Sequence, residues 1–257
     1  DLQAAGVDRL VVITSPDNHA SIQALLPQAQ LVVQDKPLGM ADGILAAQSL
    51  LASPTLIVNG ADYLEPQGLT ALVDHINTSQ SQVLLTALET AEFLTGGYFK
   101  LDQNKVVGLV EKPQPSNQPS SLFRLVADYF TDPQILFTAL DKFKSHPQDS
   151  YEQALNQVIK DQTVDLYRYS GDFYQLKYPW QVLDLMHYFL KAKLKPMIDS
   201  TATIHPTAVV DDNVVLSSGV KVLPHATIKG PSFIGPDTLI GNNALVRESM
   251  ISSNCVI

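Results

Sequence analysis

The sequence predicts an α/β domain followed by a left-handed parallel β-helix, and two observations carry this prediction. Through residues 1–198, short apolar strands alternate with helical segments, the last of which has Pro179 in its first turn. That alternation is typical of a Rossmann-like, mostly parallel sheet whose faces are covered by helices. From about Ile204 the apolar period changes to six, and residues 199–257 are expected to form a second domain.

The six-residue period is the strongest statistical signal in the chain. Neither an α-helix nor an ordinary strand repeats every six residues, whereas hexapeptide repeats build three-sided coils with the aliphatic residue pointing inward. The region 204–257 accounts for about three such coils. The aliphatic positions at steps of six are Ile204, Val210, Leu216, Val222, Ile228, Ile234, Ile240 and Val246.

Composition excludes several classes of protein. With 45% hydrophobic and 17% charged residues, the 257-residue chain has the balance of a globular protein, and its net charge of −9 offers no broad basic face to nucleic acid or anionic lipid. The single cysteine, Cys255, excludes an internal disulfide and a cysteine-based zinc site. No membrane span or signal peptide is visible, so we expect a soluble cytoplasmic protein.

Two predicted strands end in polar residues that could serve a ligand. Gln34 follows an apolar strand and precedes a loop with Gly39, and Asp62 follows the strand at residues 56–58. The carboxyl ends of parallel strands share one edge of the sheet, so both residues should project toward that edge. A glutamine amide can both donate to and accept from a nucleobase edge. Alternatively, Gln34 is an ordinary surface residue and Asp62 only shapes its turn.

Four segments together resemble the sugar-1-phosphate nucleotidylyltransferases. The segment QDKPLGMADGILAA looks like that family's base-binding loop, VNGADYL its metal-binding strand end, GLVEKP its Glu-Lys-Pro motif, and GDFYQLKYPWQVLDLM a late tryptophan-containing segment. Several members, such as the bifunctional N-acetylglucosamine-1-phosphate uridylyltransferases, append a left-handed hexapeptide β-helix. The likeness therefore covers nearly the whole chain.

The resemblance implies an Mg²⁺-dependent reaction between a nucleoside triphosphate and a sugar 1-phosphate. Gln34 and Gly39 would bind the base, and Asp62 would hold the metal, which suits a hard oxygen ligand. Gly97 and Glu111 would bind the sugar, and Lys112 would meet its phosphate as a point charge. Asp62 and Lys112 are thus the implied catalytic residues.

The sequence also departs from that family's pattern. The Gly-rich phosphate loop is not present upstream of these motifs, so we expect the chain as it stands to bind nucleotide poorly and to turn over slowly or not at all. Gln175 stands where the resemblance implies a second metal-binding acid, and an amide is a weaker magnesium ligand. Asp128 stands where a glycine is expected to approach the sugar.

Two alternatives remain open at this stage. One is a non-catalytic sugar-nucleotide-binding or scaffold protein, in which the β-helix forms a homotrimer or another homo-oligomer. The other is an acetyltransferase that uses acetyl-CoA at the β-helix, where His205 and His225 are available as bases. The alternative for these two histidines is a purely structural role as polar surface residues of the coils.

Overall fold

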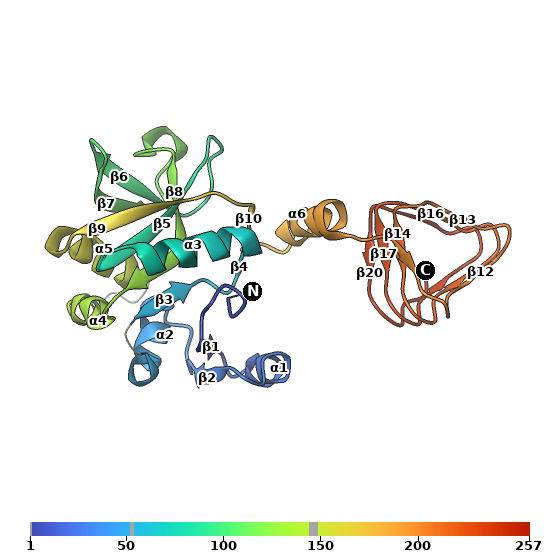
Figure 1. Cartoon of the computed structure of the whole chain (residues 1–257), viewed down its shortest axis with the longest axis horizontal. Helices are drawn as coiled ribbons and strands as arrows, with labels where there is room; N and C mark the ends of the chain where they lie inside the picture. The colour runs from blue at the N-terminus through green and yellow to red at the C-terminus, as the bar shows by residue number, and fades with distance from the viewer. Residues whose placement is uncertain (1, 52–53, 144–148) are drawn as a thin grey trace. The chain divides into compact units, whose positions relative to one another are not determined.

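The computed structural model describes residues 2–51, 54–143 and 149–257. It divides into two compact units, one comprising Asp1–Gly60 with Leu64–Phe173, and the other comprising Ala61–Tyr63 with Tyr174–Ile257. The elements of each unit are drawn in Figure 1. Among the described residues, no helix has the length and apolar character that crossing a bilayer requires.

The first unit begins with two parallel strands, β1 (Val11–Thr14) and β2 (Gln30–Val33), which flank α1 (His19–Leu25). Its larger sheet has the order β7-β6-β8-β5-β9, with β3 also paired to β8. The remaining elements are α2 (Met40–Ala46), η1 (Gln48–Leu50), β3 (Thr55–Val58), α3 (Pro66–Thr78), β5 (Val83–Glu89), β6 (Gly97–Asp102), β7 (Lys105–Glu111), η2 (Pro115–Asn117), β8 (Leu122–Phe130), α4 (Gln134–Asp141), α5 (Ser150–Asp161) and β9 (Val164–Tyr169).

The predicted α/β class is confirmed, but the larger sheet is mixed rather than mostly parallel. Strands β5 and β9 pair in parallel, whereas β8 runs antiparallel to β3, β5 and β6. The hairpin of β6 and β7 accounts for one antiparallel pair, because short connections join antiparallel neighbours and parallel pairs need long crossovers. Strand β8 then pairs with the other edge of β6, again antiparallel.

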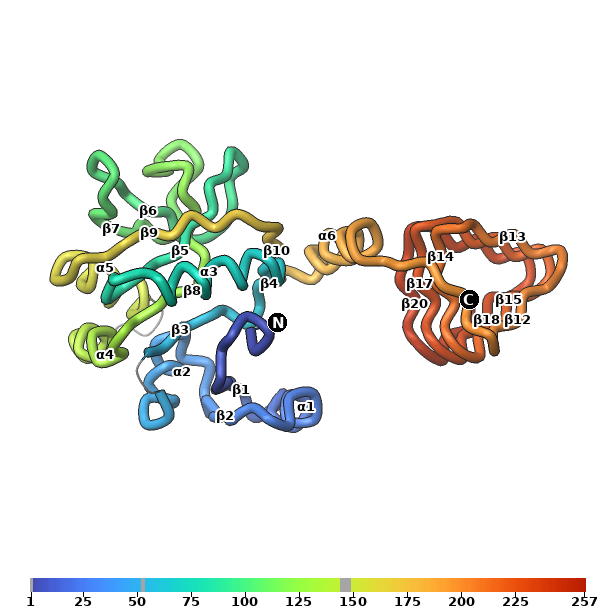
Figure 2. Tube along the Cα trace, viewed as in Figure 1, coloured from blue at the N-terminus to red at the C-terminus, as the bar shows by residue number. Residues whose placement is uncertain are grey.

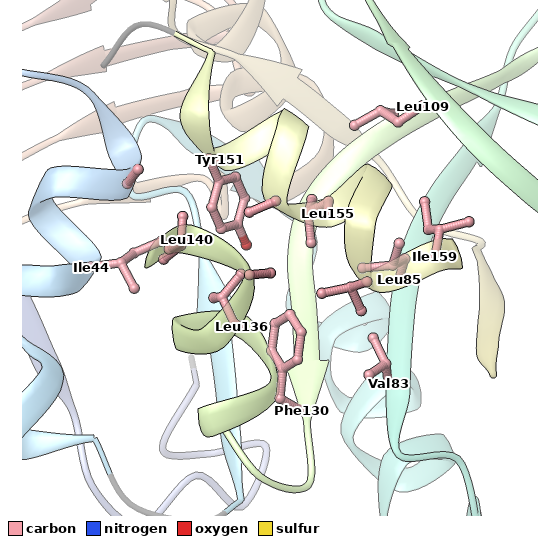
Figure 3. Packing of buried hydrophobic residues seen from close by; sticks show 14 of the residues in the cluster. Ile44, Val83, Leu85, Leu109, Phe130, Leu136, Leu140, Tyr151, Leu155 and Ile159 are labelled. Carbon is pink, nitrogen blue, oxygen red and sulfur yellow. The ribbon is translucent and has the colours of Figure 1, made fainter. Parts of the chain in front are cut away.

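Alternating residues of the central strands bury opposite faces of this sheet. On one face, Val83 and Leu85 of β5 and Phe130 of β8 pack against α4 and α5 (Figure 3). On the other face, the intervening Leu84 joins a second cluster with residues of α3. Both faces of β5 and β8 are therefore buried between helical layers, and β8 also carries the buried charges of Arg124 and Asp128.

The second unit contains α6 (Gln181–Tyr188), the π-helical η3 (Phe189–Lys193) and a parallel β-helix. Its coils appear as stacked turns in Figure 2. Three parallel sheets form its sides, with the orders β11-β14-β17-β20, β12-β15-β18 and β13-β16-β19. The strands are β11 (Met197–Ile198), β12 (Thr203–Ile204), β13 (Val209–Val210), β14 (Val214–Leu216), β15 (Lys221–Val222), β16 (Thr227–Lys229), β17 (Ser232–Ile234), β18 (Leu239–Ile240), β19 (Leu245–Arg247) and β20 (Met250–Ile251).

The register of the coils confirms the hexapeptide prediction. Thr203 pairs with Lys221, so one coil equals three hexapeptides, and the predicted aliphatic positions from Leu216 to Val246 are at most 5% exposed. The last coil differs, because Phe233 pairs with Met250 and the repeat there is one residue shorter. The aliphatic residue that follows Ile234 in this stack is consequently Ile251.

Candidate functional site

The predicted nucleotide loop lies between β2 and α2. Gln34 directly follows β2, and its backbone N–H donates to the carbonyl of Thr14 at 2.7 Å, which continues the pairing with β1. Its side-chain Nε2 donates to the carbonyl oxygen of Gly39 and to Asp42 Oδ2, both at 2.9 Å. The structure therefore brings Gln34 and Gly39 together, and the amide of Gln34 braces the loop.

These two acceptors also fix the orientation of the Gln34 amide, because reversing it would point its oxygen at two other oxygens. In this conformation the amide donor faces the loop rather than a ligand. Recognition of a nucleobase by both atoms of the amide would require Nε2 to exchange these bonds for bonds to the base.

Gly39 supplies a backbone conformation that other residues rarely adopt. Its φ of 101° and ψ of 179° lie in a region that is accessible almost only to glycine. We expect Gly39→Ala to lower the free energy of unfolding by about 1–3 kcal/mol, measured by urea denaturation. Gly60→Ala is the matched control, because an added methyl there meets nothing within 4 Å, and it should change stability little. Equal losses in both variants would contradict the strain assigned to Gly39.

The predicted sugar-binding residues meet at one end of the β6–β7 hairpin. Gly97 pairs directly with Glu111, and a methyl group at Gly97 would lie 2.9 Å from Glu111 Oε2 and 3.2 Å from Leu109 Cδ1. The space that the missing side chain leaves is thus occupied by the carboxylate of Glu111. Gly97 is not among the residues with a positive φ, so its backbone conformation does not require glycine. Its importance here is that the absence of a side chain leaves room for the Glu111 carboxylate.

Lys112 is turned back toward the start of the same hairpin. Its φ is 45°, unusual for a residue that is not glycine and that precedes a proline, and its N–H donates to the carbonyl of Gly96 at 3.1 Å. Its Nζ lies 3.7 Å from Glu111 Oε1, with 60% of the lysine side chain exposed. An ion pair this exposed contributes little to stability, so the ammonium group remains available to an anionic ligand.

Asp62 is the first residue of β4 (Asp62–Leu64), which pairs with β10 (Phe173–Gln175). Hydrogen bonds on either side of this pair, from the N–H of Glu65 to the carbonyl of Asp172 and from the N–H of Leu176 to the carbonyl of Ala61, fit an antiparallel register. In that register Asp62 lies opposite Gln175, so the two side chains share one face.

The donors at this position suit a magnesium ion that keeps most of its water. Within the described ranges, no three His, Cys, Asp or Glu side chains gather closely enough to form a metal site by themselves. Mg²⁺ is commonly held by one or two carboxylates together with substrate phosphates, so one carboxylate beside one amide oxygen is compatible with it. The residue opposite Asp62 is an amide, Gln175, and not a second acid.

A buried charge cluster on β8 was missed as a unit by the sequence analysis, which noted only Asp128. Arg124 Nη2 and the hydroxyl of Tyr151, at 2.7 Å, both donate to Asp128 Oδ2, and the guanidinium lies 5.2 Å from the Tyr151 ring centroid. The side chains of Arg124 and Asp128 are 4% and 0% exposed. The detectable signal was a pair of opposite charges four residues apart, hence on one face, in the apolar strand LFRLVADYF.

Burial is the largest cause of the pKa shifts of Asp128 and Tyr151, whereas the pKa of Arg124 is raised against burial by nearby acidic groups. Burial acts to lower the pKa of Arg124, but Asp128 first, then Tyr151, Glu152 and Glu111, raise it above its ordinary value. Burial raises the pKa of Asp128 despite Arg124 and Tyr151, which act to lower it. Burial also raises the pKa of Tyr151 well above 10, so its hydroxyl remains a donor.

The histidines of the β-helix take part in turn geometry. His205 Nδ1 lies 2.9 Å from Thr207 Oγ1 and accepts the N–H of Thr207 at 3.2 Å. The N–H of His225, a residue with φ of 62°, donates to the same threonine hydroxyl at 3.1 Å. The side chain of His205 and the backbone N–H of His225 thus both contact the Thr207 hydroxyl.

By its architecture the protein is a two-part molecule in which an α/β domain is followed in sequence by a hexapeptide β-helix. The nucleotidyl transferase family model matches residues 1–180. The chain belongs to that family.

Relatives of known function match this chain over most of its length. The bifunctional protein GlmU of Methanococcus vannielii is 26% identical over 248 residues, which cover 89% of this chain and 58% of that protein. The bifunctional protein GlmU of Streptococcus gordonii is 24% identical, and the match covers 100% of this chain and 59% of that protein. The chain thus spans about three fifths of the length of these relatives.

Solved structures show the same fold at lower identity. A candidate glucose-1-phosphate thymidylyltransferase from Bacillus anthracis, in complex with sucrose, superposes with a TM-score of 0.62 at 13% identity, covering 71% of this chain and 76% of the other. A UDP-glucose pyrophosphorylase from Acinetobacter baumannii gives 0.58 at 19% identity, covering 74% and 79%.

Proposed function

We propose that the protein transfers a nucleotidyl group to a sugar 1-phosphate, with release of pyrophosphate and dependence on Mg²⁺. In this reaction a phosphate oxygen of the sugar 1-phosphate attacks the α-phosphorus of the nucleoside triphosphate. The bond from that phosphorus to the bridging oxygen breaks, and pyrophosphate leaves. The products are an NDP-sugar and pyrophosphate.

The observation that carries this proposal is the pairing of Glu111 with Lys112 at the hairpin end. A carboxylate held over Gly97 can accept hydrogen bonds from sugar hydroxyls, while an exposed ammonium group beside it can meet a phosphate. One side chain thus suits the polar ring of the ligand and its neighbour suits the charge. Membership in the nucleotidyl transferase family supports the same reaction class.

The other predicted residues take complementary roles in the proposal. Gln34 would recognise the base after exchanging its bonds to the loop, and Gly39 would let the loop backbone approach it. Asp62, with the amide oxygen of Gln175 opposite, would hold Mg²⁺, whose chemistry is to neutralise charge on the phosphates during displacement. Lys112 would orient the attacking phosphate.

We expect the complete encoded protein to release pyrophosphate only when Mg²⁺, a nucleoside triphosphate and a sugar 1-phosphate are all present. Glu111→Gln should lower kcat/KM for the sugar phosphate by about 10- to 100-fold, the cost of losing a charged hydrogen bond. A coupled phosphate assay after pyrophosphatase addition measures the rate across a panel of bases and sugars.

The matched control is Glu89→Gln, because that carboxylate is 60% exposed and pairs with Arg168 on the surface. It should leave the rate unchanged. Specific binding of sugar nucleotides without any pyrophosphate release would instead favour a non-catalytic binding protein, and would contradict the proposal.

A further inference from the structure

Three residues on three adjacent strands form a row across the sheet. Glu111 on β7 pairs with Gly97 on β6, and the pairing of Tyr98 with Phe123 places Gly97 opposite Arg124 on β8. A methyl group at Gly97 would lie 3.6 Å from Arg124 Cβ, which agrees with this register. Directly opposed residues direct their side chains to the same face.

Glycine at the centre of this row lets the two outer side chains approach each other. With no Cβ at Gly97, the carboxylate of Glu111 leans across β6 toward the strand that carries Arg124. The Glu111 carboxylate and Arg124 Cβ therefore lie on either side of the space that a side chain at Gly97 would occupy. Coulomb attraction between the carboxylate and the Arg124 guanidinium is weakly screened, because the guanidinium is almost fully removed from water.

The guanidinium of Arg124 is held in the core by a second set of contacts. Asp128, which also accepts a hydrogen bond from the hydroxyl of Tyr151 at the start of α5, holds the guanidinium inside the core, where Figure 3 shows Tyr151 among the packed apolar side chains. Arg124 Nε and Asp128 Oδ1 are buried without a hydrogen-bond partner. A pair with two unsatisfied atoms is poorly optimised for stability alone, and an apolar pair of similar volume could replace it.

We propose that Arg124 is a positioning residue for the sugar 1-phosphate, whose buried charge holds the Glu111 carboxylate over Gly97 in the orientation that accepts sugar hydroxyls. This inference rests on the proposed function, because it assigns a purpose to the residue that stands behind Glu111. It makes Asp128 and Tyr151 the restraint that prevents Arg124 from leaving the core to pair with Glu111 directly.

The test compares ligand affinities in Arg124→Met/Asp128→Leu, which removes both charges and leaves no buried ion alone. Calorimetry on the complete encoded protein would use glucose 1-phosphate and N-acetylglucosamine 1-phosphate, with UTP and dTTP as the second class of ligand. We expect the affinity for the sugar phosphate to fall at least about tenfold and that for the nucleotide to change less than about twofold. Arg124→Lys, which keeps the charge, should retain most of the affinity.

Two comparisons separate positioning from a merely structural role. In a Glu111→Gln background the double replacement should cause no further loss of sugar-phosphate affinity, because the group that it positions is already altered. Removing the half-exposed pair of Lys142 and Asp161, 3.6 Å apart, is the matched control and should change neither affinity. Equal loss for both ligand classes, or a loss that persists without Glu111, would overturn the inference.

Gly97→Ala tests the same geometry without disturbing the ion pair. The added methyl would displace the Glu111 carboxylate, which is the mobile end of a flexible side chain, so the fold should survive. We expect the same selective loss of sugar-phosphate affinity, and unchanged affinity would contradict the inference. If the wild-type protein binds neither sugar phosphate, the proposed function itself is overturned. If the wild-type protein binds and the variants bind with the same affinity, only the role of Arg124 is overturned.

Discussion

Alanine in place of Asp128 is expected to lower the free energy of unfolding of the first unit by about 3–5 kcal/mol, the cost of leaving one member of a buried ion pair without its partner. Asp128 is fully buried and accepts hydrogen bonds from both Arg124 and Tyr151. Its loss leaves a guanidinium in an apolar layer and a tyrosine hydroxyl without its acceptor. Urea denaturation followed by circular dichroism measures the change.

The controls for this prediction follow from the same physical reasoning. Arg124→Met/Asp128→Leu removes both charges together and should cost clearly less than Asp128→Ala, because no buried ion is left alone and only the Tyr151 hydroxyl lacks its acceptor. Lys142→Ala/Asp161→Ala removes a pair that is about half exposed and should cost no more than about 1 kcal/mol. If Asp128→Ala cost no more than this surface pair, the buried cluster would not have the energetic role assigned to it.

The second unit was the more predictable part of the fold, because its information is local and repeated. Each coil points one aliphatic side chain inward from each of its three strands, so the sequence alone located the residues from Leu216 to Val246. The shortened last coil escaped prediction, since the count by sixes gives no reason to skip a residue. Only the pairing of Phe233 with Met250 reveals it.

In the candidate site, too, the contacts between residues close in sequence were predictable, and those between distant residues were not. Gln34 with Gly39, and Glu111 with Lys112, are near neighbours in sequence, and motif spacing was enough to associate the members of each pair. The contact of Arg124 with the Gly97 position depends on the register between two strands more than twenty residues apart. No local pattern specifies that register, so the residue behind Glu111 became visible only in the structure.

Removal of the carboxylate of Asp62 is expected to lower pyrophosphate release by the complete encoded protein about 10²- to 10³-fold, comparable to the loss of one preorganised electrostatic stabiliser in other enzymes. Asp62→Ala would leave only the amide of Gln175 on that face of the β4–β10 pair, and an amide oxygen carries no charge to hold Mg²⁺. The aromatic contacts of Tyr63 with Tyr188 and Phe189, at centroid distances of 5.4 and 5.3 Å, should still support the strand. The fold is therefore expected to survive the change.

A readout that does not depend on turnover separates metal binding from other roles of Asp62. Mn²⁺ can stand in for Mg²⁺, and its affinity in the presence of nucleoside triphosphate, measured by electron paramagnetic resonance, should fall in Asp62→Ala and rise in Gln175→Glu, which places a second carboxylate opposite the first. Asp74→Ala, an exposed carboxylate on α3, serves as the control and should change neither rate nor affinity. Magnesium needs few protein ligands when substrate phosphates supply the rest, so the loss of one carboxylate ligand should be measurable. A wild-type rate and wild-type Mn²⁺ affinity in Asp62→Ala would therefore show that Asp62 is not a metal ligand.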